Sequence, residues 1–406
     1  MFFLSAGRPG LRREPGRPFC GERLAVAYSG GISQGGAILE VEGGKKCVMN
    51  GWNLAAAIVA LCTMGYLSGL LLRPAMVSAC TRVVYSGPAA TVLTARSMDW
   101  KEDPQSNLWI FPRGMERDGA VGEDPVRWRS KYGSVVASAY EICTTDGMNE
   151  AGLVANLLWL AESTYPEWDG KTPALSISVW AQYLLDNFAT VEEAVAAMRS
   201  GDFTVVSDKM PDGSRMATLH LSISDATGDN AIFEYIDGKL RIHHGRDYTV
   251  MTNSPVFDQQ LTLDDYWRKI GGLTFLPGTN RASDRFVRAS FYVDALPRTS
   301  DVRHAVAGIF SVIRNTSVPL GISTEAEPNI SSTRWRTVAE QKNRIYFFES
   351  TLYPNIFWVE MDGVDFSEGS PARRLNLNDG RTYAGNVAGE FVAAEPFRFL
   401  GVEKPQ

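Results

Sequence analysis

A cysteine, an arginine and an aspartate occur together in the segment Cys80–Trp100, CTRVVYSGPAATVLTARSMDW. Apolar, alternating stretches on both sides of its central Gly-Pro pair predict two strands joined by a tight turn. An antiparallel hairpin folds its second strand back beside its first, so Arg96 and Asp99 are expected to return to Cys80. The segment therefore predicts a cluster of one thiol, one cation and one carboxylate.

Cleavage of the chain before Cys80 would supply this cluster with a general base. A free α-amino group has an ordinary pKa of about 7.7–8.0, so part of it is neutral near neutral pH. It would belong to the same residue as the thiol, and no histidine would be needed. Arg96 is expected to lower the pKa of the thiol, and Asp99 to hold the amine by a hydrogen bond. This chemistry predicts amide hydrolysis through an acyl-enzyme.

The more usual partner of a catalytic cysteine is a histidine. The four histidines, His220, His243, His244 and His304, lie in no recognisable nucleophile motif. On a strand, His243 and His244 would point to opposite faces, which is poor for joint metal binding, so we expect them to be solvated surface residues. No phosphate-binding loop, dinucleotide motif or H-E-x-x-H zinc motif occurs. We expect neither a metal nor an organic cofactor.

The residues before Cys80 have the features of a leader. The stretch 54–72 is apolar and nearly uncharged, and the three small residues before Cys80, V-S-A, resemble a signal-peptidase site. We expect 1–53 to be a non-core extension, disordered or upstream of an alternative start at Met49. We further expect 54–79 to be a cleaved signal peptide and 80–406 the catalytic domain of an exported, periplasmic protein.

Two alternatives for this leader stay open. An apolar stretch of this length could be retained as a membrane anchor, the one membrane contact expected of the chain. The box V-S-A-C also resembles a lipoprotein site, in which case Cys80 would be lipidated and the chain would be an anchored binding protein. Arg73 and Pro74 separate the apolar stretch from the box, which disfavours lipidation.

Charge and cysteine content exclude other classes of protein. The formal net charge is −6 and the isoelectric point about 5.5, so a nucleic-acid partner is not expected. Five cysteines, an odd and sparse set, do not indicate a disulfide framework. We expect Cys143 to be a buried free thiol, although a pair with Cys80 is the alternative.

The pattern after Cys80 predicts one α+β domain of antiparallel sheets with helices packed outside. Helices are expected at 173–188, 191–198, 285–296 and 302–313, the second opened by a capping box of Thr190 and Glu193. Strands are expected in the first hairpin, on both sides of the turn at 146–150, through 203–251, and at 335–339, 344–349 and 357–360.

Four separated motifs, in order, resemble the choloylglycine hydrolases, a family that includes bile salt hydrolases and penicillin V acylases. They are the opening cysteine with ARSMDW, DGMNEAGLVANLLWL (146–160), MTNSPVFD (251–258) and LPGTNRASDRFVR (276–288). The resemblance covers essentially everything after residue 79. It implies the four-layer αββα sandwich of N-terminal nucleophile hydrolases and the hydrolysis of small-molecule acyl amides.

The resemblance also implies a role for each site residue. Cys80 would be the nucleophile, Arg96 would support its thiol, and Asp99 would hold the amine. Asn253 would donate to the oxyanion hole, and Arg285 would organise the region around Cys80 and Asp99. Without the resemblance, Asn253 reads as a turn residue and Arg285 as an exposed charge beginning a helix.

Two departures from the family pattern bear on the substrate. Trp159 aligns where family members have Asn or Tyr near the oxyanion hole, and with Trp100 it predicts an aromatic-walled acyl pocket, although core packing is the alternative. The stretch between Asn253 and Arg285 is shorter than in many bile salt hydrolases. The chain thus resembles the exported Gram-negative branch, in which penicillin V acylase and acyl-homoserine-lactone acylase activities occur. A family-type tetramer is a further expectation.

Overall fold

The computed structural model describes the backbone of 36–41 and 45–50, and residues 80–406 except 123, 211–212, 214, 272–273, 323–330, 354 and 403–406. The chain divides into two compact units, 1–74 and 75–406. In the first unit the described strands β1 (Gly36–Val41) and β2 (Lys45–Asn50) pair antiparallel. The expected signal segment at 54–79 lies outside the described residues, so the predicted domain limits stay predictions.

One large sheet of the second unit contains the predicted hairpin as two of its interior strands. Its strand order is β16 (Val250–Met251), β3 (Thr81–Ser86), β4 (Val92–Trp100), β17 (Ser332–Glu340), β18 (Ile345–Ser350), β19 (Ile356–Glu360) and β21 (Gly385–Asn386). The strands are antiparallel except at the β19–β21 edge. Hydrogen-bonded neighbours on both sides therefore fix β3 and β4 in place.

A nine-stranded sheet forms the second layer. Its order is β15 (Lys239–His244), β14 (Asn230–Ile236), β13 (Leu219–Ser224), β10 (Val154–Trp159), β9 (Cys143–Asn149), β8 (Ser134–Ala139), β5 (Leu108–Phe111), β20 (Arg373–Leu375) and β22 (Val392–Ala393). Two small pairs accompany it, β11 (Ala174–Ser176) with β12 (Thr204–Val206) and β6 (Glu116–Asp118) with β7 (Arg127–Arg129).

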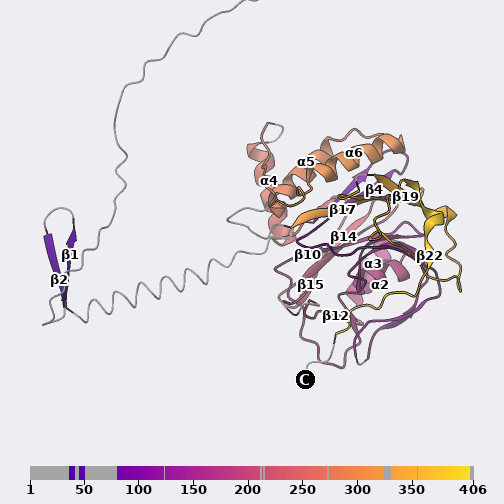
Figure 1. The fold of residues 1–406 in the computed structure, drawn as a ribbon, viewed down its shortest axis with the longest axis horizontal. Coiled ribbons are helices and arrows are strands. Elements are labelled where there is room, and N and C mark those ends of the chain that lie inside the picture. The colour runs from indigo at the N-terminus through magenta and orange to yellow at the C-terminus, as the bar shows by residue number, and fades with distance from the viewer. Residues whose placement is uncertain are drawn as a thin grey trace, which may run out of the picture. The chain divides into compact units, whose positions relative to one another are not determined.

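Helices cover the outer face of each large sheet (Figure 1). The helices α5 (Ala282–Ala295) and α6 (Val302–Asn315) contact β3 and β4, and α4 (Phe257–Ile270) packs beside α5. On the other side, α2 (Trp180–Asn187) and α3 (Val191–Ser200) contact the nine-stranded sheet. Single 3-10 turns occupy Met361–Gly363 and Ala388–Glu390. This is the predicted four-layer αββα sandwich.

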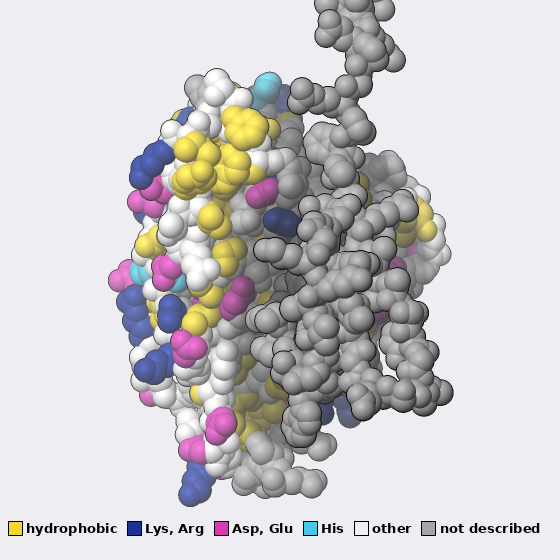
Figure 2. All heavy atoms as spheres, turned by 90° about the vertical axis from the view of Figure 1, so that its left-hand side faces the viewer, with side chains coloured by type: hydrophobic (Ala, Val, Ile, Leu, Met, Phe, Trp, Pro, Cys, Tyr) yellow, Lys and Arg dark blue, Asp and Glu magenta, His cyan; other side chains and the backbone are white. Residues whose placement is uncertain are grey.

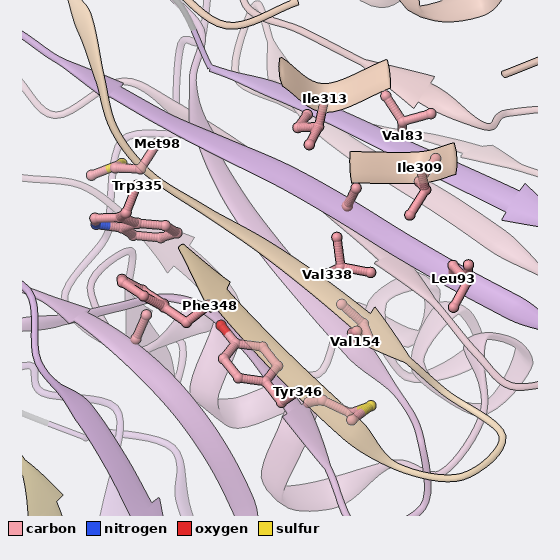
Figure 3. Packing of buried hydrophobic residues seen from close by; sticks show 14 of the residues in the cluster. Val83, Leu93, Met98, Val154, Ile309, Ile313, Trp335, Val338, Tyr346 and Phe348 are labelled. Carbon is pink, nitrogen blue, oxygen red and sulfur yellow. The ribbon is translucent and has the colours of Figure 1, made fainter. Parts of the chain in front are cut away.

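The hydrophobic core runs through these layers (Figure 3). Val83, Leu93 and Val338 come from neighbouring strands of the seven-stranded sheet, and all three are fully buried. Ile309 of α6 packs in the same cluster on the helical side, and Val154 of β10 packs in it from the facing sheet. Burial of each such side chain contributes about 1.5–3 kcal/mol, so the core holds the central hairpin rigidly.

Most predicted elements are confirmed, with two corrections. The capping box at the start of α3 is present, with Thr190 accepting from the Glu193 amide. The helix expected at 173–188 begins only at Trp180, because 174–176 pair in parallel with 204–206 as a strand. Helix α4 was not predicted, because polar Gln260 and Asp264 share its buried face and obscure the apolar period.

The face of the molecule that carries α4 bears both signs of charge, interspersed, and a cluster of hydrophobic side chains near one end (Figure 2). Exposed hydrophobic residues in and just after α4 are Leu263, Tyr266, Ile270 and Phe275. No described helix is long and apolar enough to cross a membrane.

Candidate active site

The β3–β4 hairpin brings the predicted thiol, cation and carboxylate residues together. Thr81 pairs with Ser97, so Cys80, just before β3, meets the end of β4. The Asp99 amide nitrogen lies 3.4 Å from the Cys80 Sγ atom and donates to it, and the Asp99 carbonyl lies 3.6 Å away. The Arg96 Nη2 atom is 4.0 Å from the same sulfur. The spatial part of the sequence prediction therefore agrees with the structure.

The electrostatic part of that prediction needs a correction. Burial raises the pKa of the Cys80 thiol above its ordinary value and outweighs Arg96, which lowers it. The expected net lowering is therefore not found where Cys80 is still joined to the preceding residue. A thiol that stays protonated needs a base to remove its proton, which is the function expected of the liberated amine.

Asp99 is a buried carboxyl whose hydrogen bonds and neighbouring charges only partly offset the cost of burying it. The Thr333 hydroxyl donates to its Oδ1 atom, and the Ser97 hydroxyl lies 3.2 Å from Oδ2. Burial raises the pKa of Asp99 to about 6, although Arg285 and these hydroxyls oppose the rise. The carboxylate is thus ionised at pH 7–8 and able to accept a hydrogen bond from an amine.

Arg285 ties three separate segments together from the first turn of α5. Its Nη1 atom donates to the Cys80 carbonyl and to the Thr81 hydroxyl, both at 2.6 Å. Its Nη2 atom lies 3.0 Å from the Asn253 Oδ1 atom. The side chain is fully buried, and burial lowers its pKa to about 10, so it stays charged. It is not the exposed charge that its position at a helix start would suggest.

Asn253 lies in the connection between β16 and α4. Its Oδ1 atom accepts from Arg285, and its Nδ2 atom donates to the Trp159 carbonyl at 2.6 Å. The Gln260 side-chain amide (Nε2) also donates to the Asn253 main-chain carbonyl. These contacts fix the side-chain amide in one orientation and leave its second Nδ2 hydrogen available for a substrate oxygen. The backbone amide of Leu160, next to Trp159, is the other nearby donor, but it donates to the Thr218 carbonyl at 3.0 Å.

An apolar pocket opens beside the Cys80 thiol. Trp100 and Trp159 form one wall, with ring centroids 5.6 Å apart and planes at 51°. The Arg215 guanidinium lies 4.0 Å from the Trp159 ring centroid. Residues from the far end of the chain also reach the pocket, since Leu400 lines it. The two tryptophans thus lie where the aromatic-walled acyl pocket was predicted.

Sequence reasoning missed several residues around this site. Thr333 and Leu400 are far from the motifs in sequence and carried no signal. Tyr140 also lines the pocket, as does Cys143, which is a free thiol but only partly buried rather than buried as expected. Tyr140 lies near the end of the apolar run at 134–142 and Cys143 directly follows it, and nothing in the sequence indicated that the hairpin turn here reaches the site.

The expectation that His243 and His244 are solvated surface residues needs a correction, because both lie partly buried beside carboxylates. His220 is fully buried, with Nδ1 3.1 Å from Glu234 Oε1, and His243 is half-buried beside the same carboxylate. The Phe257 amide at the start of α4 donates to both Glu234 oxygens at 3.1–3.2 Å. His244 pairs instead with Asp229, so the two adjacent histidines do face different partners. Within the described residues no group of three or more His, Cys, Asp or Glu side chains is arranged so that it could hold a metal ion.

Comparisons with known proteins agree with this geometry. A family model for linear amide C–N hydrolases, choloylglycine hydrolase family, matches residues 80–379. The penicillin V acylase of Pectobacterium atrosepticum is 51% identical over 360 residues, which cover 83% of this chain and 96% of that protein. A bile salt hydrolase/transferase of Clostridium perfringens is 27% identical over 269 residues, 59% and 77% of the two chains.

Solved structures show the same relationship. The structure of penicillin V acylase from Agrobacterium tumefaciens is 58% identical with a TM-score of 0.75, over 80% of this chain and all of that one. A conjugated bile acid hydrolase from Clostridium perfringens, 22% identical with a TM-score of 0.64, shares the fold over 74% and 97% of the chains. The chain therefore belongs to the choloylglycine hydrolase family and is a linear amide C–N hydrolase similar to the penicillin V acylases.

Proposed function

We propose that the mature enzyme begins at Cys80 and hydrolyses acyl amides of the penicillin V type with this cysteine as nucleophile. The observation that carries the proposal is the convergence of three segments, the end of β4, the start of α5 and the loop at Asn253, on Cys80 beside an apolar pocket. Arg96 and the Asp99 main chain approach the sulfur, while Arg285 links the Cys80 carbonyl to Asn253. All of these residues lie within the stretch matched by the family model.

In the proposed reaction the free α-amine of Cys80 removes the thiol proton as the sulfur attacks the amide carbonyl carbon. The C–N bond of the tetrahedral intermediate then breaks, and the ammonium returns the proton to the departing amine. Water, deprotonated by the same α-amine, attacks the resulting thioester and releases the acid. Asp99, ionised above about pH 6, would hold the amine through the cycle.

The negative charge of the intermediate needs a fixed donor. The Asn253 side-chain amide is oriented by Arg285 on its oxygen and by the Trp159 carbonyl on its nitrogen. Its remaining hydrogen can stabilise the oxyanion without reorganisation, an arrangement that typically contributes about 10²–10³ in rate. The positive charge of Arg285 behind Asn253 polarises this amide further.

Removal of the leader by a signal peptidase, and export to the periplasm, are part of the proposal. The family match begins at residue 80, directly after the small residues V-S-A. Burial disfavours the lipoprotein alternative, because a lipidated sulfur would have to leave a site where Cys80 is 2% exposed. With Cys80 not lipidated, the apolar pocket beside its thiol is available for the acyl group of a substrate.

Phenoxyacetyl amides are the proposed substrates because two tryptophans line the acyl pocket and the 51% identical relative is a penicillin V acylase. N-acyl homoserine lactones and bile-acid conjugates present other acyl groups to the same thiol. Side-by-side assay of the three classes ranks them. Bile-acid amides are expected to be the poorest substrates, because the bile salt hydrolase relative is only 27% identical.

The test combines intact mass with kinetics. The active protein should begin at Cys80 with a free amine, and Cys80→Ala should lower kcat/KM for every amide about 10⁴-fold or more. Asn253→Ala should retain the mature start and lower kcat about 10²–10³-fold. An active protein that begins elsewhere, a diacylglycerol mass on Cys80, or undiminished turnover by Cys80→Ala would refute the proposal.

A further inference from the structure

The hairpin turn between β8 and β9 has an unusual backbone. Its two central residues, Tyr140 and Glu141, have φ angles of 52° and 54°, and the Ile142 amide donates to the Ala139 carbonyl at 3.1 Å. Two successive left-handed residues define a type I′ turn, in which Asn-Gly or a similar pair is strongly preferred. Tyrosine and glutamate have bulky side chains that disfavour this conformation, so surrounding contacts must impose it.

Glu141 supplies the contacts that hold the turn on its outer side. Its Oε1 atom accepts from the Asn107 side-chain amide at 2.7 Å and from the Trp109 indole at 3.0 Å. Arg374 lies 3.6 Å from its other oxygen. In addition, the Tyr140 amide donates to the Pro104 carbonyl at 2.6 Å. The strained turn is therefore fixed by partners on other segments.

The turn places Tyr140 in the acyl pocket, against Trp100. The Trp100 indole Nε1 donates to the Tyr140 hydroxyl at 2.8 Å. Trp100 directly follows Asp99, whose main-chain atoms contact the nucleophile, and its own carbonyl accepts from Arg334 at 2.9 Å. Both the backbone and the ring of Trp100 are thus held, and Tyr140 is the group that holds the ring nitrogen.

We propose that Tyr140 is a positioning residue that sets acyl specificity by fixing the Trp100 indole. A fixed indole, tilted at 51° to Trp159, presents a defined ring surface to an aromatic acyl group close to the scissile carbonyl. A flexible alkyl chain gains less from a wall of fixed orientation. This inference rests on the proposed amide hydrolysis, and it predicts that the Tyr140 hydroxyl favours arylacetyl groups over alkyl chains.

Tyr140→Phe tests this, because it removes only the hydroxyl and keeps both the ring and the turn. Kinetics are measured on phenoxyacetyl, decanoyl and acetyl amides of one common amine. We expect KM for the phenoxyacetyl amide to rise about 5–10-fold, the usual effect of losing one hydrogen bond. The kcat/KM for the acetyl amide, whose acyl group is too short to use the wall, should stay within about twofold. The preference for phenoxyacetyl over decanoyl should fall.

A matched control and a double-mutant cycle make the result decisive. Tyr383→Phe removes a hydroxyl that donates to the Asn376 carbonyl at 2.9 Å, away from the pocket, and should leave all three substrates unaffected. In a Trp100→Phe background, Tyr140→Phe should have no further effect on the preference, because phenylalanine has no N–H to hold.

An unchanged phenoxyacetyl KM, an equal loss on the acetyl amide, or additive effects in the Trp100→Phe background would overturn the inference. A wild-type enzyme inactive on every amide would instead refute the proposed function.

Discussion

Two buried carboxylates in this molecule, Asp99 and Glu234, have opposite pKa shifts. Burial raises the pKa of Asp99 to about 6. Burial opposes ionisation of Glu234 as well, but a hydrogen bond from His220, the nearby His243 ring and a hydrogen bond from the Phe257 amide bring its pKa down to about 2. The two carboxylates differ in their partners. Asp99 has two hydroxyl donors and the nearby charges of Arg285 and Arg336, whereas Glu234 has the His220 ring, the neighbouring His243 and the amide at a helix N-terminus.

The two carboxylates differ in whether they can accept a further hydrogen bond: Asp99 can accept one, whereas the oxygens of Glu234 already have their partners. Glu234 joins β14, β13 and the start of α4, just after the segment that holds Asn253, so its bonds stabilise the scaffold. Asp99 keeps acceptor capacity at the site where the α-amine of Cys80 would be released. An under-compensated carboxylate beside a nucleophile is a typical feature of active sites.

The largest expected effect is the loss of activity on replacing Asp99. Asp99→Asn should lower kcat/KM by about 10²–10⁴-fold, because the amide cannot hold an ammonium as a carboxylate does. Steady-state kinetics of the mature enzyme measure this. Activity near the wild-type level would show that Asp99 does not serve the amine.

The same substitution should not destabilise the unprocessed chain. The folded-state pKa of about 6 lies above the ordinary 3.8, so the ionised group opposes folding above pH 6 and this penalty vanishes below pH 4. At pH 8 Asp99→Asn should raise the free energy of unfolding by up to about 3 kcal/mol. Urea denaturation of a chain kept unprocessed by Ala79→Leu tests the sign, and a loss of stability would contradict the comparison.

Replacing Glu234 should have the opposite effect. Its folded pKa of about 2 lies below the ordinary 4.5, so it stabilises the fold fully above pH 4.5 and progressively less as pH falls toward 2. Glu234→Gln should lower the free energy of unfolding at pH 7 by about 3 kcal/mol. The effect on kcat/KM should stay below about tenfold, since Glu234 acts only through α4. A fall in kcat/KM of more than about tenfold, with the free energy of unfolding little changed, would contradict the assignment of a structural role to Glu234.

The pH dependence of kcat/KM is a further test of the difference between Asp99 and Glu234. The α-amine must be neutral to act as the base, so kcat/KM should fall about tenfold for each pH unit below its ordinary pKa of about 7.7–8.0. Asp99 must also be ionised to hold the amine, so a second, steeper limb should begin below about pH 6. The charge of the released ammonium favours ionisation and shifts this limb downward. A profile of kcat/KM from pH 4 to 8 measures the limb, and Glu234→Gln should leave its midpoint unchanged. A profile that lacks the second, steeper limb at or below pH 6 would contradict the assignment to Asp99.

The smallest expected effect comes from one of the two hydroxyls on Asp99. Ser97→Ala removes the donor 3.2 Å from Oδ2, so the pKa of Asp99 should rise and the acidic limb should shift upward by about half a pH unit. Ser222→Ala, at a buried serine of β13 outside the site, is the matched control and should cause no shift. A downward shift in Ser97→Ala would be inconsistent with this geometry.

The local elements of the site could be predicted from sequence. The hairpin of β3 and β4 is encoded by alternating residues around one turn, and its antiparallel pairing brings Arg96 and Asp99 to Cys80. Asn253 and Arg285 could be assigned only because their motifs resemble a family, since neither a turn asparagine nor a helix-start arginine indicates catalysis by itself.

The remaining features depend on contacts between segments far apart in the chain. Thr333 reaches Asp99 across 234 positions, and Glu234 meets the first turn of α4, a helix whose buried Gln260 and Asp264 hide its period. The strained turn at Tyr140 and Glu141 contradicts local preference, because bonds from distant residues impose it. No pattern within a window of neighbouring residues contains this information.

The pocket lined by both Cys80 and Leu400 has a practical consequence for handling the enzyme. The Leu400 carbonyl accepts from the Ser176 and Ser178 hydroxyls, and its amide donates to the Ile142 carbonyl, so the segment around Leu400 is tied to the pocket beside Cys80. A purification tag at the front would block the amine outright. A fusion partner or solid support joined shortly after Leu400 would lie close to a wall of the pocket, and should be separated from it by a flexible spacer.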